Sequence, residues 1–222
     1  KEGPILEGDE RFVFDKGDVP FVNHRISNSS YLKKNKDNYH NSEYALSLLN
    51  KYGSIHDRKM HRNWLIDYFY ISKINNRNDF IGLDIFDALM FATDSLAGLS
   101  VQDRRFYFNT INQKFYPIFY DGIPNIIDRN QNLISKSIKF DQLIKIQKKN
   151  MSFIIPSMFD GKISFSAKEG ADRALRLVGS INILDFNNYL TDLGLKIDKN
   201  NLIKIINKIK SNLIEIKNFE QN

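Results

Sequence analysis

Two aspartates, Asp103 and Asp121, stand at the outer ends of two aromatic, β-branched runs that a short polar stretch separates. Such a pattern predicts a β-hairpin with a four-residue loop. If Asn109 faces Lys114 across that loop, Asp103 faces Tyr120 and lies diagonal to Asp121. Directly paired residues of an antiparallel ladder lie about 4.5–5.5 Å apart. The spacing therefore predicts that the two carboxylates approach each other at the open end of the hairpin.

Two like charges at that separation need compensation by a cation, an arginine or a shared proton. Mg²⁺ and Mn²⁺ prefer hard oxygen ligands, and one or two carboxylates together with substrate phosphates are a usual set. Asp121 precedes Gly122, so its carboxylate could project from the strand end into a cleft. The sequence also fits an ordinary strand end, in which Asp121-Gly122 forms a turn and Asp103 pairs with Arg104 or Arg105 on the surface.

Asp94 is a candidate of a different kind, because it lies near the end of a predicted helix and shortly before Gly98. A carboxylate at a helix end, beside a glycine-containing loop, can act as a general base. It can equally face solvent, where it is poorly placed for the helix dipole. The sequence leaves both interpretations open.

Histidines offer a further candidate, since His56 and His61 flank Asp57 and Arg58 in a predicted loop. They could form a catalytic or metal-binding pair, although loop histidines beside charged residues are commonly solvated. The sequence contains no Gly-Xaa-Ser-Xaa-Gly elbow, no glycine-rich phosphate loop and no His-Glu-Xaa-Xaa-His motif. The aspartates are therefore the stronger candidates.

The composition is that of a folded domain, because 42% of the 222 residues are hydrophobic. No run of about 18 apolar residues occurs, so we expect no transmembrane segment. The first residues lack the apolar stretch of a signal peptide and begin with Lys1, which predicts a piece of a longer protein or a processed form. The absence of cysteine excludes disulfides and thiolate zinc sites. It leaves the compartment open, either cytoplasmic or cell-surface-associated.

The net charge of +6 is compatible with phosphate-bearing partners. The basic residues are scattered, however, and abundant Lys, Asn and Ile are typical of a compositionally biased genome, so we do not expect nucleic acid as a partner. The densest basic cluster lies in the predicted C-terminal helix, which could alternatively bind nucleic acid or a membrane. Binding to nucleic acid through that helix would weaken steeply with salt.

The elements that position these candidates are expected to be mostly helices around the one hairpin. Residues 1–41 predict loops and short extended pieces. Hydrophobic spacing and capping residues predict a helix at 42–53 that begins at Ser42, and another at 84–96 that begins at Asp84. Further helices are predicted at 61–73, 139–150, 167–177, 183–193 and 200–219, with an extended stretch at 153–165.

The order helix, short loop, aromatic hairpin and Asp-Gly resembles the catalytic core of protein-kinase-like enzymes. More specifically, Arg-Phe-Tyr-Phe-Asn at 105–109 and Tyr-Pro-Ile-Phe-Tyr-Asp at 116–121 resemble the spore-coat protein CotH family of atypical kinases. The opening Glu-Gly-Pro-Ile-Leu at 2–6 is also similar to a segment of that family. The resemblance covers residues 84–122 best.

The resemblance implies roles for three aspartates. Asp121 matches the metal-binding Asp, and Asp103 stands where the family usually has Asn as a second metal ligand. Asp94 is the nearest match to the catalytic Asp. The implied catalytic residues are thus Asp94 and Asp103, and the implied metal ligands are Asp121 and Asp103. Two features depart from the family pattern: Asp103 replaces Asn, and neither a glycine-rich loop nor a strand lysine precedes this region.

We therefore expect a single α+β domain over residues 1–222, mostly helical, that corresponds to a protein-kinase-like large lobe with a central β-hairpin and lacks the N-terminal small lobe. The implied reaction transfers the γ-phosphoryl group of ATP, with Mg²⁺ or Mn²⁺, to a hydroxyl of a protein or saccharide. The alternative is a non-catalytic binding module or pseudokinase associated with surface polysaccharide or coat assembly. The oligomeric state is left open.

Overall fold

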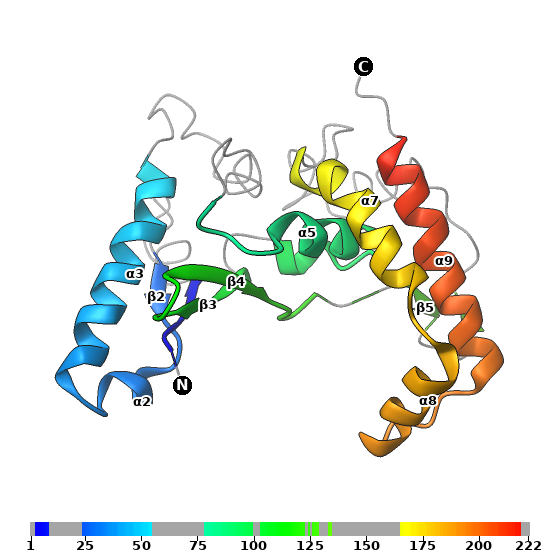
Figure 1. The fold of residues 1–222 in the computed structure, drawn as a ribbon, viewed down its shortest axis with the longest axis horizontal. Coiled ribbons are helices and arrows are strands. Elements are labelled where there is room, and N and C mark those ends of the chain that lie inside the picture. Colours follow the sequence, from blue (N-terminus) through cyan, green and yellow to red (C-terminus); the bar gives the residue numbers. More distant parts are fainter. Residues whose placement is uncertain are drawn as a thin grey trace.

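The computed structural model describes residues 3–8, 24–54, 78–99, 103–122, 124, 126–128, 133–134 and 165–218 (Figure 1). About 58% of them are helical, and four strands form an antiparallel sheet. The predicted α+β class with a helical majority is confirmed at this level. None of the helices among the described residues is long and apolar enough to cross a membrane.

The sheet has the strand order β2-β1-β3-β4. Its members are β1 (Ile5–Gly8), β2 (His24–Ile26), β3 (Arg105–Asn109) and β4 (Lys114–Ile118). The β3–β4 hairpin pairs Asn109 with Lys114 and Arg105 with Ile118, which is the register predicted from the sequence. The hairpin is therefore half of a larger sheet, because β1 pairs with β3 along its other edge.

One face of the sheet is apolar because alternate residues of each strand point to the same side. Leu6, Phe106, Phe108 and Phe115 are all buried on it. Phe80, just before the next helix, stacks on Phe115 with ring centroids 5.1 Å apart. Helix α3 (Lys36–Ser54) covers this face with buried apolar side chains (Figure 1). The first hydrophobic core lies between them.

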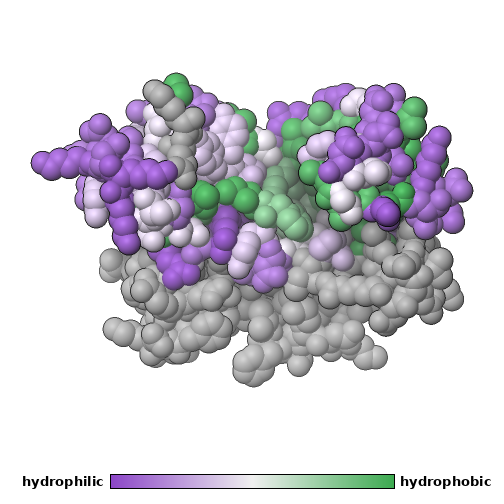
Figure 2. All heavy atoms as spheres, turned by 90° about the horizontal axis from the view of Figure 1, so that it is seen from below, coloured by the Kyte–Doolittle hydropathy of each residue, from purple (hydrophilic) through white to green (hydrophobic). Residues whose placement is uncertain are grey.

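A second core lies among helices α5 (Leu83–Ala92), α7 (Phe165–Gly179) and α9 (Lys199–Lys217), with α8 (Ile183–Asp192) partly packed against it. The bounds of α7, α8 and α9 agree with the predicted helices to within about two residues, whereas α5 ends at Ala92 and not at residue 96, so Asp94 lies after the helix. The predicted apolar face of α9 is buried on the chain's own core, through Leu202, Ile206, Leu213 and Ile216. Figure 2 shows the hydrophobic residues gathering toward the middle of the described face, with hydrophilic ones at its outer flanks.

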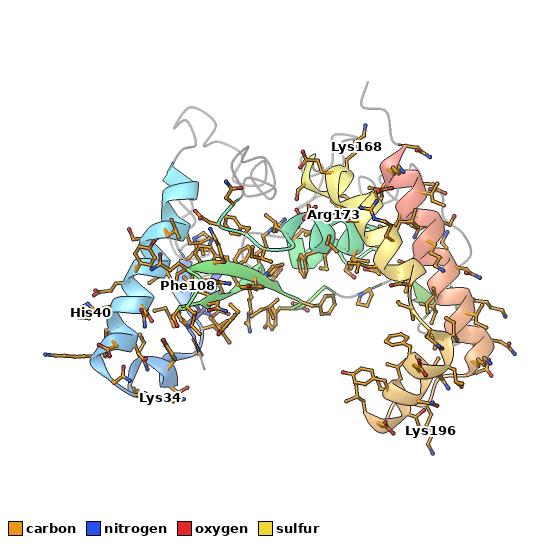
Figure 3. All side chains as sticks on the ribbon, viewed as in Figure 1. Lys34, His40, Phe108, Lys168, Arg173 and Lys196 are labelled. Carbon is orange, nitrogen blue, oxygen red and sulfur yellow. The ribbon has the colours of Figure 1, made fainter. Side chains whose placement is uncertain are left out.

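Helix α5 connects the two cores. Leu83, at its first turn, belongs to the core under the sheet, whereas Ala88 and Phe91 belong to the core among the helices. Arg173 of α7 reaches the first turn of α5 and pairs with Asp84 (Figures 1 and 3). Helix α5 is therefore packed against the core of the sheet at its start and against the helices along the rest of its length.

Two predicted helix starts are wrong. Helix α3 begins at Lys36, not at Ser42, which is buried in its interior. The cap is Asn35, whose side-chain oxygen accepts a hydrogen bond from the backbone N–H of Asn38 at 2.9 Å. The polar stretch that was predicted as a loop therefore includes the first turn of α3. It also contains the short helix α2 (Ser29–Leu32). Helix α5 is preceded by Gly82 in a left-handed conformation (φ 71°), so Asp84 lies inside its first turn and is not its cap.

Several predicted features lie outside the described residues. These are the helices at 61–73 and 139–150, the pair His56 and His61, and the extended stretch at 153–165 except for its last residue, Phe165, which begins α7. Two short strands, β5 (Ile127–Asp128) and β6 (Leu133–Ile134), form a separate antiparallel pair.

Replacing Gly170 by alanine is expected to lower the free energy of unfolding by about 1–3 kcal/mol. Helix α7 crosses the start of α5 at Gly170, and an added Cβ would overlap main-chain atoms of Asp84 and approach the backbone nitrogen of Ile85 at 2.7 Å. A main chain cannot rotate away as a side chain can, so the two helices would have to separate. Urea unfolding followed by circular dichroism measures the loss.

Gly179 of the same helix provides the matched control, because a Cβ there would meet nothing within 4 Å. Alanine at that position is expected to leave the free energy of unfolding unchanged or to raise it by about 0.4–1 kcal/mol, because alanine lowers the conformational entropy of the unfolded chain. Equal effects of the two substitutions would contradict close packing of α7 on α5.

Candidate functional site

The turn after α5 is ordered by its own hydrogen bonds. Asp94 has a left-handed backbone (φ 54°), and its N–H donates to the carbonyl of Phe91 at 3.2 Å. The N–H of the buried Ser95 donates to the carbonyl of Met90 at 2.8 Å, and its hydroxyl lies 2.8 Å from that of Thr93. The turn thus places Asp94, half-buried, in a defined position before the short helix η3 (Leu96–Leu99).

Helix η3, which follows this turn directly, touches the exit of the hairpin through Gly98. A Cβ on Gly98 would lie 2.9 Å from the carbonyl oxygen of Tyr120 and 3.2 Å from the Cα of Gly122. Only glycine permits so close an approach of two main chains. The segment that carries Asp94 and the segment that carries Asp121 are therefore in direct contact, although the hairpin separates them in the sequence.

Asp121 is exposed, and its backbone is also left-handed, with φ 44°. This conformation costs an L-residue about 1–2 kcal/mol, and aspartate is among the few residues that visit it. The next residue, Gly122, is buried against the ring of Phe119 and the side chain of Met90. Asp121 therefore lies on the surface at a position where the chain turns sharply.

Asp103 lies in the turn just before β3 and is half-buried. The ladder ends at the pair Arg105–Ile118, so Asp103 and Tyr120 lie beyond its last paired residues. Convergence of Asp103 with Asp121 on one ion stays a prediction. Within the part of the chain that the structure describes, no group of three or more His, Asp or Glu side chains could hold a metal ion.

A buried ion pair between Arg104 and Asp87 connects the elements around the candidate site. The guanidinium of Arg104 lies 3.1 Å from the carboxylate of Asp87 on α5, and the two side chains are 2% and 0% exposed. The Nε of Arg104 donates to the carbonyl of Leu99 at 3.0 Å. Arg104 is thus not on the surface, contrary to one alternative drawn from the sequence. It ties α5, η3 and the start of β3 together.

The opposite face of the sheet from the first core carries a row of charged residues across three strands. Glu7 of β1 lies directly between Arg25 of β2 and Arg105 of β3 in the register. Its carboxylate accepts from Arg25 at 2.9 Å and pairs with Arg105 at 2.7 Å. The guanidinium of Arg105 also stacks over the ring of Tyr120, 3.3 Å from its centroid. Tyr120, the last member of this row, directly precedes Asp121 in the chain.

Sequence reasoning singled out the three aspartates as candidates but not the residues that contact the segments carrying them. The sequence indicated Gly98 only as the glycine of the loop beside Asp94, and Glu7 lies too far away in the sequence to be linked to the hairpin. The aromatic Tyr120 before Asp121 was a usable signal, because an exposed aromatic beside an arginine commonly forms a cation–π contact.

Comparison of the chain with protein-family models, with curated proteins and with solved structures found no match. What the site does is therefore inferred from its own residues and contacts.

Proposed function

We propose that this chain is the large lobe of a CotH-like kinase, and that it transfers the γ-phosphoryl group of ATP to a hydroxyl of a protein or saccharide with the help of Mg²⁺ or Mn²⁺. The observation that carries the proposal is the contact of Gly98 with Tyr120 and Gly122. It brings the turn with Asp94 against the strand exit with Asp121, as a phosphoryl-transfer site of this kind requires for its base and its metal ligand.

The roles follow from the chemistry of the carboxylates. Asp121, exposed at the strand exit, would hold the metal ion, and Asp103 would assist it as a second ligand. Mg²⁺ keeps several waters and takes substrate phosphates besides one or two protein carboxylates, so a cluster of three is not needed. The ion neutralises the charge of the transferring phosphoryl group. Asp94 would orient the acceptor hydroxyl and take its proton.

Backbone strain supports the assignment. Asp94, Gln113 and Asp121 are the non-glycine residues with positive φ among those that the structure describes. Gln113 lies in the hairpin loop, where this conformation is common. The other two are both candidate site residues, and strained residues cluster at active sites, where the surrounding structure holds them.

Replacing Asp121 by asparagine is expected to weaken Mn²⁺–ATP binding by about 10- to 100-fold or more, given that even indirect partners of a metal ligand have effects of that size. Asparagine also tolerates the left-handed backbone, so the fold should persist. A fluorimetric titration of Mn²⁺ in the presence of ATP measures the affinity.

The matched control is Asp192→Asn, which removes an exposed carboxylate at the end of α8. Binding should be unaffected by that change. Equal Mn²⁺ affinities for wild type and Asp121→Asn would remove the metal role of Asp121, and with it the proposed reaction.

A non-catalytic binding module or pseudokinase, associated with surface polysaccharide or coat assembly, is the second candidate. It is favoured by the departures of the sequence from the kinase pattern, which are Asp103 in place of Asn and the lack of a glycine-rich loop and strand lysine before this region. Nucleotide at 100 times its Kd would stabilise the fold by about 2.7 kcal/mol. A thermal unfolding assay that shows no shift with any nucleotide would favour this second candidate over the kinase.

A further inference from the structure

Tyr120, the residue before Asp121, is held from two independent directions. Its carbonyl oxygen lies against Gly98, where an added Cβ would approach it to 2.9 Å. Its ring lies under the guanidinium of Arg105, with 3.3 Å between the Cζ atom and the ring centroid. The main chain that leads into Asp121 is therefore constrained by η3 on one side and by the sheet on the other.

The guanidinium of Arg105 is itself held in place by an ion pair with Glu7 of the neighbouring strand β1. Its Nη2 lies 2.7 Å from one oxygen of Glu7, and the other oxygen accepts from Arg25 at 2.9 Å. The Glu7 side chain is only 7% exposed. Because a charge so far from water is costly unless it is paired, this three-residue row has few alternative arrangements. The guanidinium of Arg105, on which the ring of Tyr120 stacks, is thus held in a nearly fixed orientation.

We propose that Tyr120 and Arg105 are positioning residues for Asp121. The stack between ring and guanidinium holds the chain in the left-handed turn at Asp121, so that the carboxylate is already oriented when a metal ion binds. A metal-binding side chain that neighbouring residues already hold in the right orientation binds the ion more tightly, because it loses less conformational entropy on binding. This inference rests on the proposed metal role of Asp121, and it adds the residues that set the affinity of that site.

A purely structural role for Tyr120 would show in global stability. Tyr120 is 39% exposed and belongs to neither core. Its removal should therefore affect the turn at 120–122 far more than the midpoint of unfolding. Local hydrogen exchange and Mn²⁺ affinity are the readouts that separate positioning from general stabilisation.

The test compares Tyr120→Leu, which removes the aromatic face, with Tyr120→Phe, which keeps it. We expect faster exchange of the amides of Asp121 and Gly122 in the leucine variant, and Mn²⁺ affinity in the presence of ATP about 2- to 30-fold weaker, the loss of one cation–π contact. The phenylalanine variant should behave as wild type in both measurements.

Arg105→Lys is the partner variant, because lysine keeps the charge beside Glu7 but lacks the planar group that stacks. It should reproduce the effects of Tyr120→Leu. The double variant should be no worse than either single variant, since both remove the same contact.

Unchanged amide exchange at Asp121 and Gly122 in both Tyr120→Leu and Arg105→Lys would overturn the inference, whatever the metal result. Faster exchange with unchanged Mn²⁺ affinity would also overturn it, because the turn would then not set the site. If wild type binds no Mn²⁺ while the exchange responds as expected, the stack holds the turn but the proposed kinase function fails.

Discussion

Replacing Arg104 by methionine is expected to lower the free energy of unfolding by about 3–5 kcal/mol, the usual loss when one partner of a buried ion pair is removed. The carboxylate of Asp87 would stay at 0% exposure without the guanidinium that now lies 3.1 Å away. The carbonyl of Leu99 would also lose its donor. Urea unfolding followed by tryptophan fluorescence and circular dichroism measures the change.

The double variant Arg104→Met with Asp87→Leu should be less destabilised than the sum of the two single variants, because the second change removes the charge that the first leaves behind. Lys217→Met is the exposed control. Lys217 pairs with Asp172 at 2.7 Å on the surface of α7 and α9, where solvent weakens the attraction, and its loss should be much smaller. If Arg104→Met costs no more than Lys217→Met, the buried pair does not brace the site.

Stability is expected to fall by about 3 kcal/mol between pH 6.5 and pH 4 because of His24. Burial lowers the pKa of His24 from 6.5 to about 4, although a hydrogen bond with Asn50 opposes the shift. The unfolded chain therefore binds a proton on this ring at a pH where the folded chain does not. The contribution is complete above the unfolded pKa and is lost as the pH falls toward the folded value.

Carboxylates also titrate at the acid end of this range, so the measurement is a comparison of variants. His24→Gln should flatten the fall in stability between pH 6.5 and 4, as measured by urea midpoints. His40→Gln is the matched control, because the side chain of His40 is 76% exposed beside Glu43. A wild type and a His24→Gln variant with the same pH dependence would refute a buried neutral histidine.

Local signals in the sequence predicted much of the framework. The hairpin register followed from one short loop between two aromatic runs, because a two-strand pairing across four residues involves only neighbours in the chain. The helices α7, α8 and α9 followed from their apolar periodicity. The start of α3 was missed, because the cap Asn35 stands in a polar stretch with no apolar period.

The docking of β1 and β2 was beyond such reasoning. These strands have four and three residues, too few to show a period. The partner of β1 in the hairpin lies about a hundred residues further along the chain, as the pair Leu6–Phe106 illustrates. Arg104 was misplaced for a related reason, since an arginine is expected on the surface unless its partner is known.

The sequence by itself determined the candidate carboxylates and the hairpin that separates Asp103 from Asp121, whereas the turn that carries Asp94 appeared only in the structure, because α5 ends at Ala92. Only the tertiary structure decided that Gly98 meets Tyr120 and Gly122, and that Arg105 is held by Glu7 while it stacks on Tyr120. Local periodicity and turn chemistry act over a few residues and leave their mark on the sequence. Contacts between distant segments depend on how the two cores pack as a whole, and no single stretch of the chain records that outcome.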